Sequence, residues 1–367
     1  MNTKKMRYVW FLVILCIFCL TLFLARTRSK VEMRNRIYHQ WNEHFVVSKG
    51  KESYVRTTND SNQTVVLSEA QSYGMLITVA AAEKGQAQQA DFDRLYHYYL
   101  NHRLEGTQLM SWKQTIRNGK AKDEDHNATD GDLYIAYALL KAAQQWPKQA
   151  KDYQAQAKAI LEDILAHNYN EETGVLTVGN WANQDSEFYH LMRTSDTLPA
   201  QFQIFYEVTK DSKWLDIKEK MLQQLQTISS QTKTGLLPDF IWVDEQGTRV
   251  ADPKTIESKY DGAYSYNACR LPYNLVQSKD KTSQKLVKKM LNFFKSQRNL
   301  YAGYDLKGKA LNNHQAASFL APIVYASEHE KGYLKLVQQN KYIFTQDLPL
   351  NNYYDATMTT MIALELF

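Results

Sequence analysis

Apolar residues recur along most of the chain with the spacing of amphipathic helices. Positions i, i+3, i+4 and i+7 are apolar in most of the helical segments, and Leu133, Ala136, Tyr137 and Leu140 form one clear stripe. The pattern predicts twelve helices, over residues 33–46, 68–84, 90–102, 131–146, 150–166, 197–209, 212–228, 264–277, 284–297, 314–327, 332–342 and 353–366.

Six short polar runs each open a predicted helix. They mix hydroxyl, amide, carboxylate and aromatic side chains, and they cover residues 68–74, 129–132, 195–197, 264–270, 312–315 and 353–357. Paired in order, the twelve segments form six hairpins at irregular spacing, which disfavours a solenoid built from one repeated unit. The pattern indicates an all-α (α/α)6 toroid, with the polar starts of the inner helices gathered at one rim.

Local signals refine this outline. Ser68, Thr129, Asn313 and Asn352 are plausible N-caps of the helices that they open. Strand signals are few, and short hairpins are expected only in loops, at residues 174–178 and 240–243. The stretch from about residue 235 to 262 is too long for a plain connection, which favours a functional loop.

The first 30 residues differ in character from the rest. Basic residues flank an unbroken apolar run over residues 9–25 on both sides. A run of about 17 residues is near the lower limit for a membrane-spanning helix. It is long for a signal-peptide core, and no Ala-x-Ala cleavage site follows it. We therefore expect a cytoplasmic tail and uncleaved anchor over residues 1–30, with a cleaved signal peptide as the alternative, and a catalytic domain over residues 31–367.

Composition limits the classes of partner. The formal net charge is +5, but six of the 44 basic residues lie in the first 30, and the remaining 38 face 39 acidic residues. This nearly even balance of charge argues against nucleic-acid binding. Cys269 is the only cysteine in the expected soluble domain, so that domain forms no internal disulfide. In residues 31–367 no CxxC, HExxH or clustered histidine suggests a metal, and no cofactor is expected.

Four stretches together carry a family resemblance. They read SEAQSYGML from Ser68, LMSWK from Leu109, ATDGDLYIAYALL from Ala128 and YSYNACRLP from Tyr264. In this order and spacing the chain resembles glycoside hydrolase family 8, and the resemblance covers nearly everything after the anchor. The resemblance implies an (α/α)6 fold and inverting cleavage of β-1,4-linked glucans, xylans or chitosan.

The resemblance assigns a general acid and a sugar-binding carboxylate. Glu69 matches the acid, which must have a raised pKa to give a proton to the departing glycosidic oxygen. A helix N-terminus stabilises a carboxylate, so burial or a nearby second carboxylate must supply the rise. Asp130 matches an acid that contacts the sugar at the cleavage point. The alternative for both is a first-turn acid that complements the helix dipole, and Asp132 fits that alternative better.

The general base is where the chain departs from the best-known family pattern. Many members carry Asp where this chain has Asn267, and an amide cannot accept the proton of the attacking water. A subgroup of the family shows this Asn and takes a Glu from the preceding long loop. Glu257 is therefore our first candidate for the base and Asp261 the second, with a solvated loop acid as the alternative.

Further residues are expected around these carboxylates. Arg270 follows Asn267 by three, so both are expected on one face of a helix, where Arg270 resembles the family Arg that orients the water. Its alternative is an ion pair at the rim. Trp112 resembles an aromatic platform under a sugar ring, with a core Trp as the alternative. Tyr266 and Tyr354 are expected to line the same cleft, and Asp196 either binds substrate or caps its helix.

The sequence thus predicts a single-pass membrane protein with an extracellular endo-β-glucanase domain. Its first substrate is a glucan, cellulose or mixed-linkage β-1,3-1,4-glucan, and chitosan is the second. The anchor favours work on a polymer leaving its own cell, such as a secreted exopolysaccharide, with a synthase as partner. Two other classes stay open: a non-catalytic glucan-binding protein, for which Asn267 argues, and a polysaccharide lyase on a similar toroid.

Overall fold

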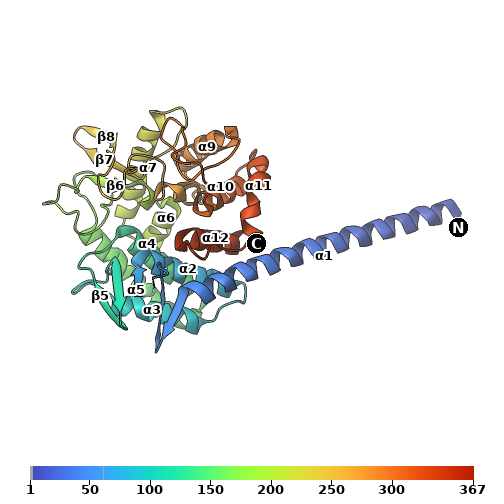
Figure 1. Cartoon of the computed structure of the whole chain (residues 1–367), viewed down its shortest axis with the longest axis horizontal. Helices are drawn as coiled ribbons and strands as arrows, with labels where there is room; N and C mark the ends of the chain where they lie inside the picture. Colours follow the sequence, from blue (N-terminus) through green and yellow to red (C-terminus); the bar gives the residue numbers. More distant parts are fainter. Residues whose placement is uncertain (1–2, 61) are drawn as a thin grey trace.

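The computed structural model describes residues 3–60 and 62–367, so the first two residues of the expected cytoplasmic tail lie outside the described residues. The described chain is predominantly helical (Figure 1). Its α-helices are α1 (Thr3–Phe45), α2 (Ser68–Glu83), α3 (Gln89–Asn101), α4 (Thr129–Gln145), α5 (Ala150–His167), α6 (Pro199–Thr209), α7 (Lys213–Ser230), α8 (Leu271–Val276), α9 (Lys281–Ser296), α10 (Ala317–His329), α11 (Leu334–Asn340) and α12 (Tyr353–Leu366).

The even-numbered helices form an inner ring. Helix α2 packs on α4, α8 on α6 and on α10, α10 on α12, and α12 closes the ring against α2. Helices α4 and α12 are covered on nearly all sides, so most of their residues are buried, whereas α6 buries only Pro199, Gln201, Phe202 and Phe205. Outer helices bury one face only, and α9 is amphipathic for that reason. The predicted alternation of outer and inner helices is present, but pairing in order from the first helix was wrong: α2 pairs with α3, α4 with α5, α6 with α7, α8 with α9 and α10 with α11, and α1 packs on α12.

Three small antiparallel sheets add to the helices. Their strands are β1 (Val46–Lys49), β2 (Glu52–Val55), β3 (Thr64–Leu67), β4 (Lys113–Arg117), β5 (Lys120–Asp123), β6 (Leu191–Arg193), β7 (Phe240–Asp244) and β8 (Gly247–Val250). The sheets have the orders β1-β2, β3-β4-β5 and β6-β7-β8. The strand expected at 240–243 is confirmed as β7. The strand expected at 174–178 is wrong, because Leu176 forms only an isolated bridge with Tyr169.

Several predicted helix starts are also wrong. The helix expected at 264–277 begins at Leu271, after a short 3-10 turn at Ala268–Arg270, because Tyr264 is engaged in a bridge with Tyr304. Of the expected N-caps, only Asn352 caps its helix through its side chain, which accepts from the Asp355 backbone N–H at 3.1 Å. Ser68 and Thr129 are instead the first residues of α2 and α4, and Asn313 precedes α10.

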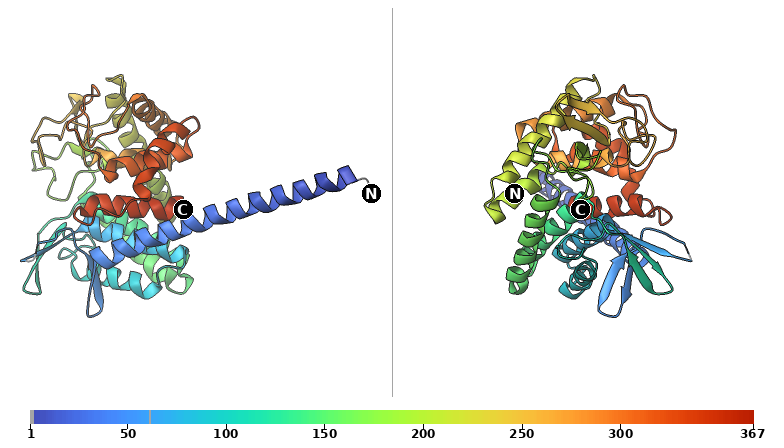
Figure 2. Two further views of the ribbon diagram at one scale, coloured as in Figure 1. Left: turned by 45° about the vertical axis from the view of Figure 1, so that its right-hand side comes forward. Right: turned by 90° about the vertical axis from the view of Figure 1, so that its left-hand side faces the viewer.

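Helix α1 joins the predicted anchor to the domain without a break. The expected boundary between residues 30 and 31 falls inside this helix, which projects straight from the globular part (Figures 1 and 2). Met6–Phe45 is long and apolar enough to cross a membrane by length and composition. The end nearest the domain is packed into it: Ile37, Trp41 and Phe45 are buried, and the Trp41 indole donates to Thr357 Oγ1 at 2.9 Å.

Candidate active site

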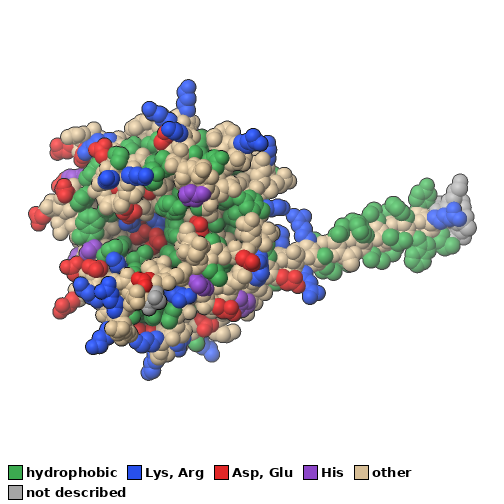
Figure 3. Space-filling view, in the orientation of Figure 1, with side chains coloured by type: hydrophobic (Ala, Val, Ile, Leu, Met, Phe, Trp, Pro, Cys, Tyr) green, Lys and Arg blue, Asp and Glu red, His purple; other side chains and the backbone are tan. Residues whose placement is uncertain are grey.

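A cleft of about 380 Å³ opens where the inner helices begin. A hollow with acidic and basic side chains on its floor is visible in Figure 3. The cleft lining brings together six of the predicted site residues, namely Glu69, Trp112, Asp130, Glu257, Tyr266 and Asn267. Tyr354, also expected there, lines it as well, whereas Arg270 and Asp196 lie buried beneath it.

Glu69 lies in the first turn of α2, and 20% of its side chain is exposed. Its Oε2 accepts a hydrogen bond from Arg270 Nη1 at 2.7 Å. Burial raises the pKa of Glu69 to about 7, although the Arg270 charge opposes the shift and the Asp130 charge adds to it. The rise expected from burial is therefore present despite the helix terminus. A carboxyl that keeps its proton to near-neutral pH is suited to proton donation.

Arg270 is the centre of the hydrogen-bond network under the cleft. Its guanidinium is 1% exposed and reaches Glu69, Asp130 and Tyr73, the last at 2.9 Å. It also donates to Ser195 Oγ at 2.8 Å and to Asn267 Oδ1 at 3.2 Å. The expected contact between Arg270 and Asn267 exists, but the helical reason given for it was wrong, since Asn267 precedes the 3-10 turn.

Asp130 is held as an anion between two guanidinium groups. Its Oδ2 accepts from Arg270 at 3.1 and 3.2 Å, and its Oδ1 lies 2.8 Å from Arg193 Nη1. Burial alone would raise the pKa of Asp130, but the Arg193 and Arg270 charges outweigh it and lower the pKa. A fixed negative charge at this place can stabilise positive charge that develops on a sugar ring.

Arg193 is a site residue that the sequence analysis missed. It ends strand β6, lines the cleft, and lies 3.7 Å from Glu257 as well as against Asp130. A signal was present in the sequence, because Arg193 lies two residues before the polar run that opens at Ser195. Asp196 lies behind it: the carboxylate is 3.6 Å from Arg193, 1% exposed and not part of the cleft lining. This position argues against direct sugar binding by Asp196.

Glu257 reaches the cleft from the long loop before Asn267. Its side chain is 46% exposed, and its Oε2 accepts from Asn267 Nδ2 at 2.8 Å. Asp261, the second candidate for the base, is completely buried. Its carboxylate accepts the backbone N–H groups of Ile256, Glu257 and Ser258 at 2.8, 3.0 and 2.7 Å. The two acids of this loop therefore have different environments, and only Glu257 faces the cleft.

Two further buried carboxylates hold segments that carry site residues. Asp132 accepts from the Met110 backbone N–H and from Asn127 Nδ2, both at 2.8 Å, and so fixes the segment leading to Trp112. Asp239 accepts from the backbone N–H groups of Ser265 and Ala268 at 3.1 and 2.7 Å. Burial raises the pKa of each of these carboxyls to about 8. Asp132 thus lies in the support of the cleft and not in its lining.

Partly exposed aromatic rings extend away from Trp112. Its ring stacks on His126 at 5.8 Å between centroids, and Trp181 follows at 6.2 Å from His126. Phe188 lies 5.4 Å from Trp181, and Trp242 stacks on Phe188 at 6.3 Å. Of these rings, Trp112 lines the cleft, whereas Trp181, Phe188 and Trp242 pack against the small hydrophobic cluster that contains Phe240. Trp112 is only partly buried and its ring borders the cleft, which suits a platform for a sugar ring better than a core position.

The comparisons with known proteins agree with this geometry. Residues 13–365 match the family described as Glycosyl hydrolases family 8. A Beta-glucanase of Niallia circulans is 30% identical over 78% of this chain and 72% of its own length. An Endoglucanase A of Acetivibrio thermocellus is 27% identical over 83% of this chain and 62% of its own length. The solved Beta-1,3-1,4-glucanase of Paenibacillus sp. X4 superposes with a TM-score of 0.82 at 24% identity, covering 93% of this chain and 92% of that one.

The fold and the cleft therefore define a glycoside hydrolase. The chain belongs to glycosyl hydrolases family 8, and it is a glycosidase of the endoglucanase type. The structure shares the fold of its family neighbours, an (α/α)6 barrel.

Proposed function

We propose that the chain is an inverting endo-β-glucanase in which Glu69 is the general acid and Glu257 the general base. The observation that carries this proposal is that the two carboxyls line one cleft, one buried with a raised pKa and one exposed on a loop. Two carboxyl groups with such different environments are what acid–base cleavage of a glycoside requires.

The proposed reaction is a single displacement at the anomeric carbon. Glu69 gives its proton to the glycosidic oxygen as the bond between that oxygen and the anomeric carbon breaks. Glu257 takes a proton from a water molecule, whose oxygen bonds to the anomeric carbon on the opposite face and inverts it. The Asp130 carboxylate stabilises the positive charge that develops on the sugar ring, and Arg193 and Arg270 hold that carboxylate in place. No step needs a cofactor.

A neutral glucan is the substrate that we favour. The two relatives described above are named for glucanase and endoglucanase activity, and the partly exposed Trp112 in the cleft suits a neutral sugar ring. Chitosan is the second candidate. As a polycation it calls for a strongly acidic cleft, whereas Arg193 and Arg270 balance much of the negative charge here.

The binding-protein alternative has lost its main support. It required that no acid face Glu69, because Asn267 replaces the usual base. Glu257 occupies the same cleft and is held by that very Asn267. A polysaccharide lyase would use a Tyr, His or Lys base and would tolerate the loss of Glu69, so the same experiment tests it.

The anchoring of the enzyme is part of the proposal. The apolar half of α1 is exposed along its length and continues without a break into the helix that packs on α12. A membrane helix joined in this way holds the domain close to the outer surface of the cell membrane. That position suits trimming of an exopolysaccharide as its synthase exports it. Alkaline extraction of membranes tests it: an anchored chain stays in the pellet, and a cleaved, released chain does not.

The test of the reaction uses the full chain in detergent with β-glucan, carboxymethylcellulose, xylan and chitosan. We expect reducing-sugar release from a glucan, an α-anomeric first product by NMR, and a loss of roughly 100-fold or more in Glu69→Gln and in Glu257→Gln. Glu245→Gln, an exposed acid of the β7-β8 turn, is the matched control.

Activity that survives Glu257→Gln would exclude Glu257 as the base. Glucan binding by the wild type with no hydrolysis of any polymer would favour the binding protein.

A further inference from the structure

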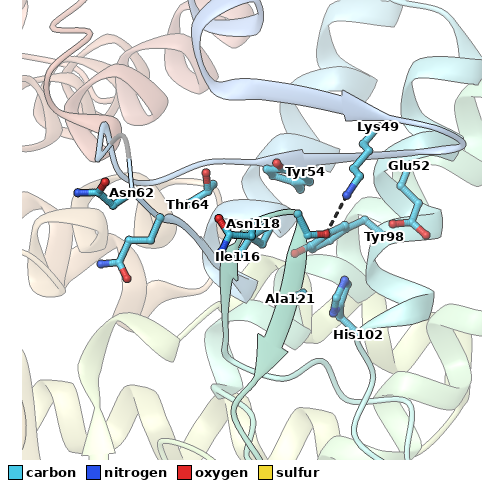
Figure 4. A pocket seen from close by; sticks show the side chains of 12 residues that line it. Lys49, Glu52, Tyr54, Asn62, Thr64, Tyr98, His102, Ile116, Asn118 and Ala121 are labelled. Carbon is cyan, nitrogen blue, oxygen red and sulfur yellow. Dashed lines mark hydrogen bonds between the residues drawn. The ribbon is translucent and has the colours of Figure 1, made fainter.

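A second and larger pocket lies away from the active site. It has a volume of about 540 Å³, within the range of small-molecule sites. Two hairpins form its walls, β1-β2 on one side and β4-β5 on the other, and they lie side by side at one end of the molecule (Figures 1 and 2). Lys49 Nζ of the first hairpin donates to the Gly119 carbonyl at the tip of the second, at 2.9 Å (Figure 4).

The floor of this pocket is a fixed column of rings. Tyr54 lies 5.2 Å from Tyr98 between centroids, and Tyr98 lies 4.1 Å from His102. His102 Nδ1 is in turn 2.8 Å from a carboxylate oxygen of Asp123 on β5. The rings therefore tie α3 to both hairpins. Figure 4 shows the Tyr98 side chain extending from α3 toward the β4-β5 hairpin.

The Tyr98 hydroxyl is a polar group without a protein partner among the described residues. The residue is 2% exposed, and its oxygen is buried with no hydrogen bond. Burying a hydroxyl without a hydrogen-bond partner costs free energy. The Tyr98 hydroxyl therefore favours a site where a molecule outside the chain provides the partner. Because Tyr98 lines the pocket, the group in question is a ligand that enters between the hairpins.

The remaining lining selects the chemical class of that ligand. Lys49 faces Glu52 in the β1-β2 register, the Glu52 carboxylate binds Asn101, and the His102 ring is paired with Asp123. The charged side chains of the lining are therefore few and of both signs, and no cluster of one sign selects an anion or a cation. The other polar lining consists of amide and hydroxyl side chains, including Thr64 and Asn118. Amides and hydroxyls over aromatic rings match a neutral polyhydroxylated molecule.

The position of the pocket connects it with the active site. Strand β3 contributes Thr64 to this pocket and runs three residues further to Leu67, which lines the catalytic cleft beside Glu69. At about 3.3 Å per residue, the two sites lie roughly 10 Å apart along this strand. We propose that the pocket is a second binding site for neutral β-linked glucan chains, held by the Tyr98 hydroxyl and the amide and hydroxyl groups around it. The inference rests on the proposed glucan specificity.

The test is titration calorimetry of the full chain in detergent with cellotetraose and with a mixed-linkage tetraose. Glu69→Gln serves as the background so that neither ligand is consumed. We expect two equivalents to bind. Tyr98→Phe removes only the hydroxyl and is expected to weaken one of the two sites about tenfold. Ala121→Trp, at an exposed position of the wall, is expected to abolish that site by filling it.

Two results would overturn the inference. One is the binding of one equivalent or none by the Glu69→Gln background. The other is unchanged binding of two equivalents in both Tyr98→Phe and Ala121→Trp. The outcome is separable from that of the proposed function. A wild type that hydrolyses glucan while the background binds only one equivalent refutes the second site alone, and a wild type that hydrolyses no polymer refutes the proposed reaction.

Discussion

The side-chain amide of Asn267 donates to the Glu257 carboxylate at 2.8 Å. Glu257 belongs to the long loop, and Asn267 lies where that loop meets the following 3-10 turn. The Asn267 carbonyl oxygen accepts from Arg270 at 3.2 Å, so the amide cannot turn over without losing both bonds. Asn267 stands where many family members carry the base itself. In this chain the amide instead fixes the direction of a carboxylate supplied by the loop.

Substitution of Asn267 is expected to slow the reaction while both catalytic carboxyls stay in the cleft. A hydrogen bond to a charged group contributes about 1.5–3 kcal/mol, so Asn267→Ala is expected to lower kcat roughly 10- to 100-fold. Asn267→Asp places a second carboxylate beside Glu257 and raises the pKa of the pair by like-charge repulsion. The acid limb of its pH profile should then move to higher pH. An Asn267→Asp enzyme with an unmoved acid limb would contradict this role.

Asp261 is expected to position the base. Asp261→Asn takes an acceptor away from the three N–H groups of residues 256–258 and is expected to lower the free energy of unfolding by about 1–3 kcal/mol. The rate should fall roughly tenfold or more, because a displacement of the loop moves Glu257. Asp252→Asn, at an exposed acid of the same loop, is the control. Thermal unfolding and kcat are measured together.

The same pair of measurements separates the two candidate bases. If Glu257 is the base, Glu257→Gln loses activity while its melting temperature stays close to that of the wild type. If Asp261 were the base, Asp261→Asn would lose all activity and Glu257→Gln would keep most of it.

The sequence alone predicted most of the helices and the general acid. It did not predict which residues hold the general base in position. The longer segments with a clear helical period are predicted well, whereas α8 and α11 are only six and seven residues long and α8 begins later than expected. Glu69 was found because it lies in a stretch that matches the family resemblance. The strands are three to five residues long, too short for a period of two to stand out. Their pairing, such as β3 with β4, also joins segments about 50 residues apart.

The sequence ranked Glu257 above Asp261 only through the family resemblance and gave no physical reason for the order. Both acids occupy one polar loop, and which of them turns inward depends on the three backbone N–H groups that close around Asp261. Arg193 was missed for a related reason. An arginine at the end of a three-residue strand looks like a surface residue until folding places Asp130 and Glu257 on either side of it.

The pH dependence should report the environment of Glu69. Its pKa of about 7 means that the protonated acid persists to near-neutral pH, and kcat should fall about tenfold per pH unit above that point.

The negative charge of Asp130 helps to raise the pKa of Glu69, so removing that charge lowers the pKa of Glu69. In Asp130→Asn the remaining activity should therefore decline from a lower pH than in the wild type. A basic limb that stays in place or moves upward would show that another group controls it. Glu245→Gln should leave the limb unchanged.

The approach of α2 to α4 depends on the absence of a side chain at Gly131. A Cβ placed there would lie 2.2 Å from Ser68 Oγ, 2.7 Å from Ser68 Cβ and 3.0 Å from its backbone carbonyl carbon. Gly131→Ala must therefore push apart the two helix starts that carry Glu69 and Asp130. We expect it to lower the free energy of unfolding by about 1–3 kcal/mol, measured by denaturant titration, and to reduce kcat.

Ser68→Gly removes the two closest atoms, so the double variant should lose less stability than the two single losses predict. Strict additivity of the two losses would mean that the contact is relieved elsewhere and that the helix spacing does not depend on this glycine.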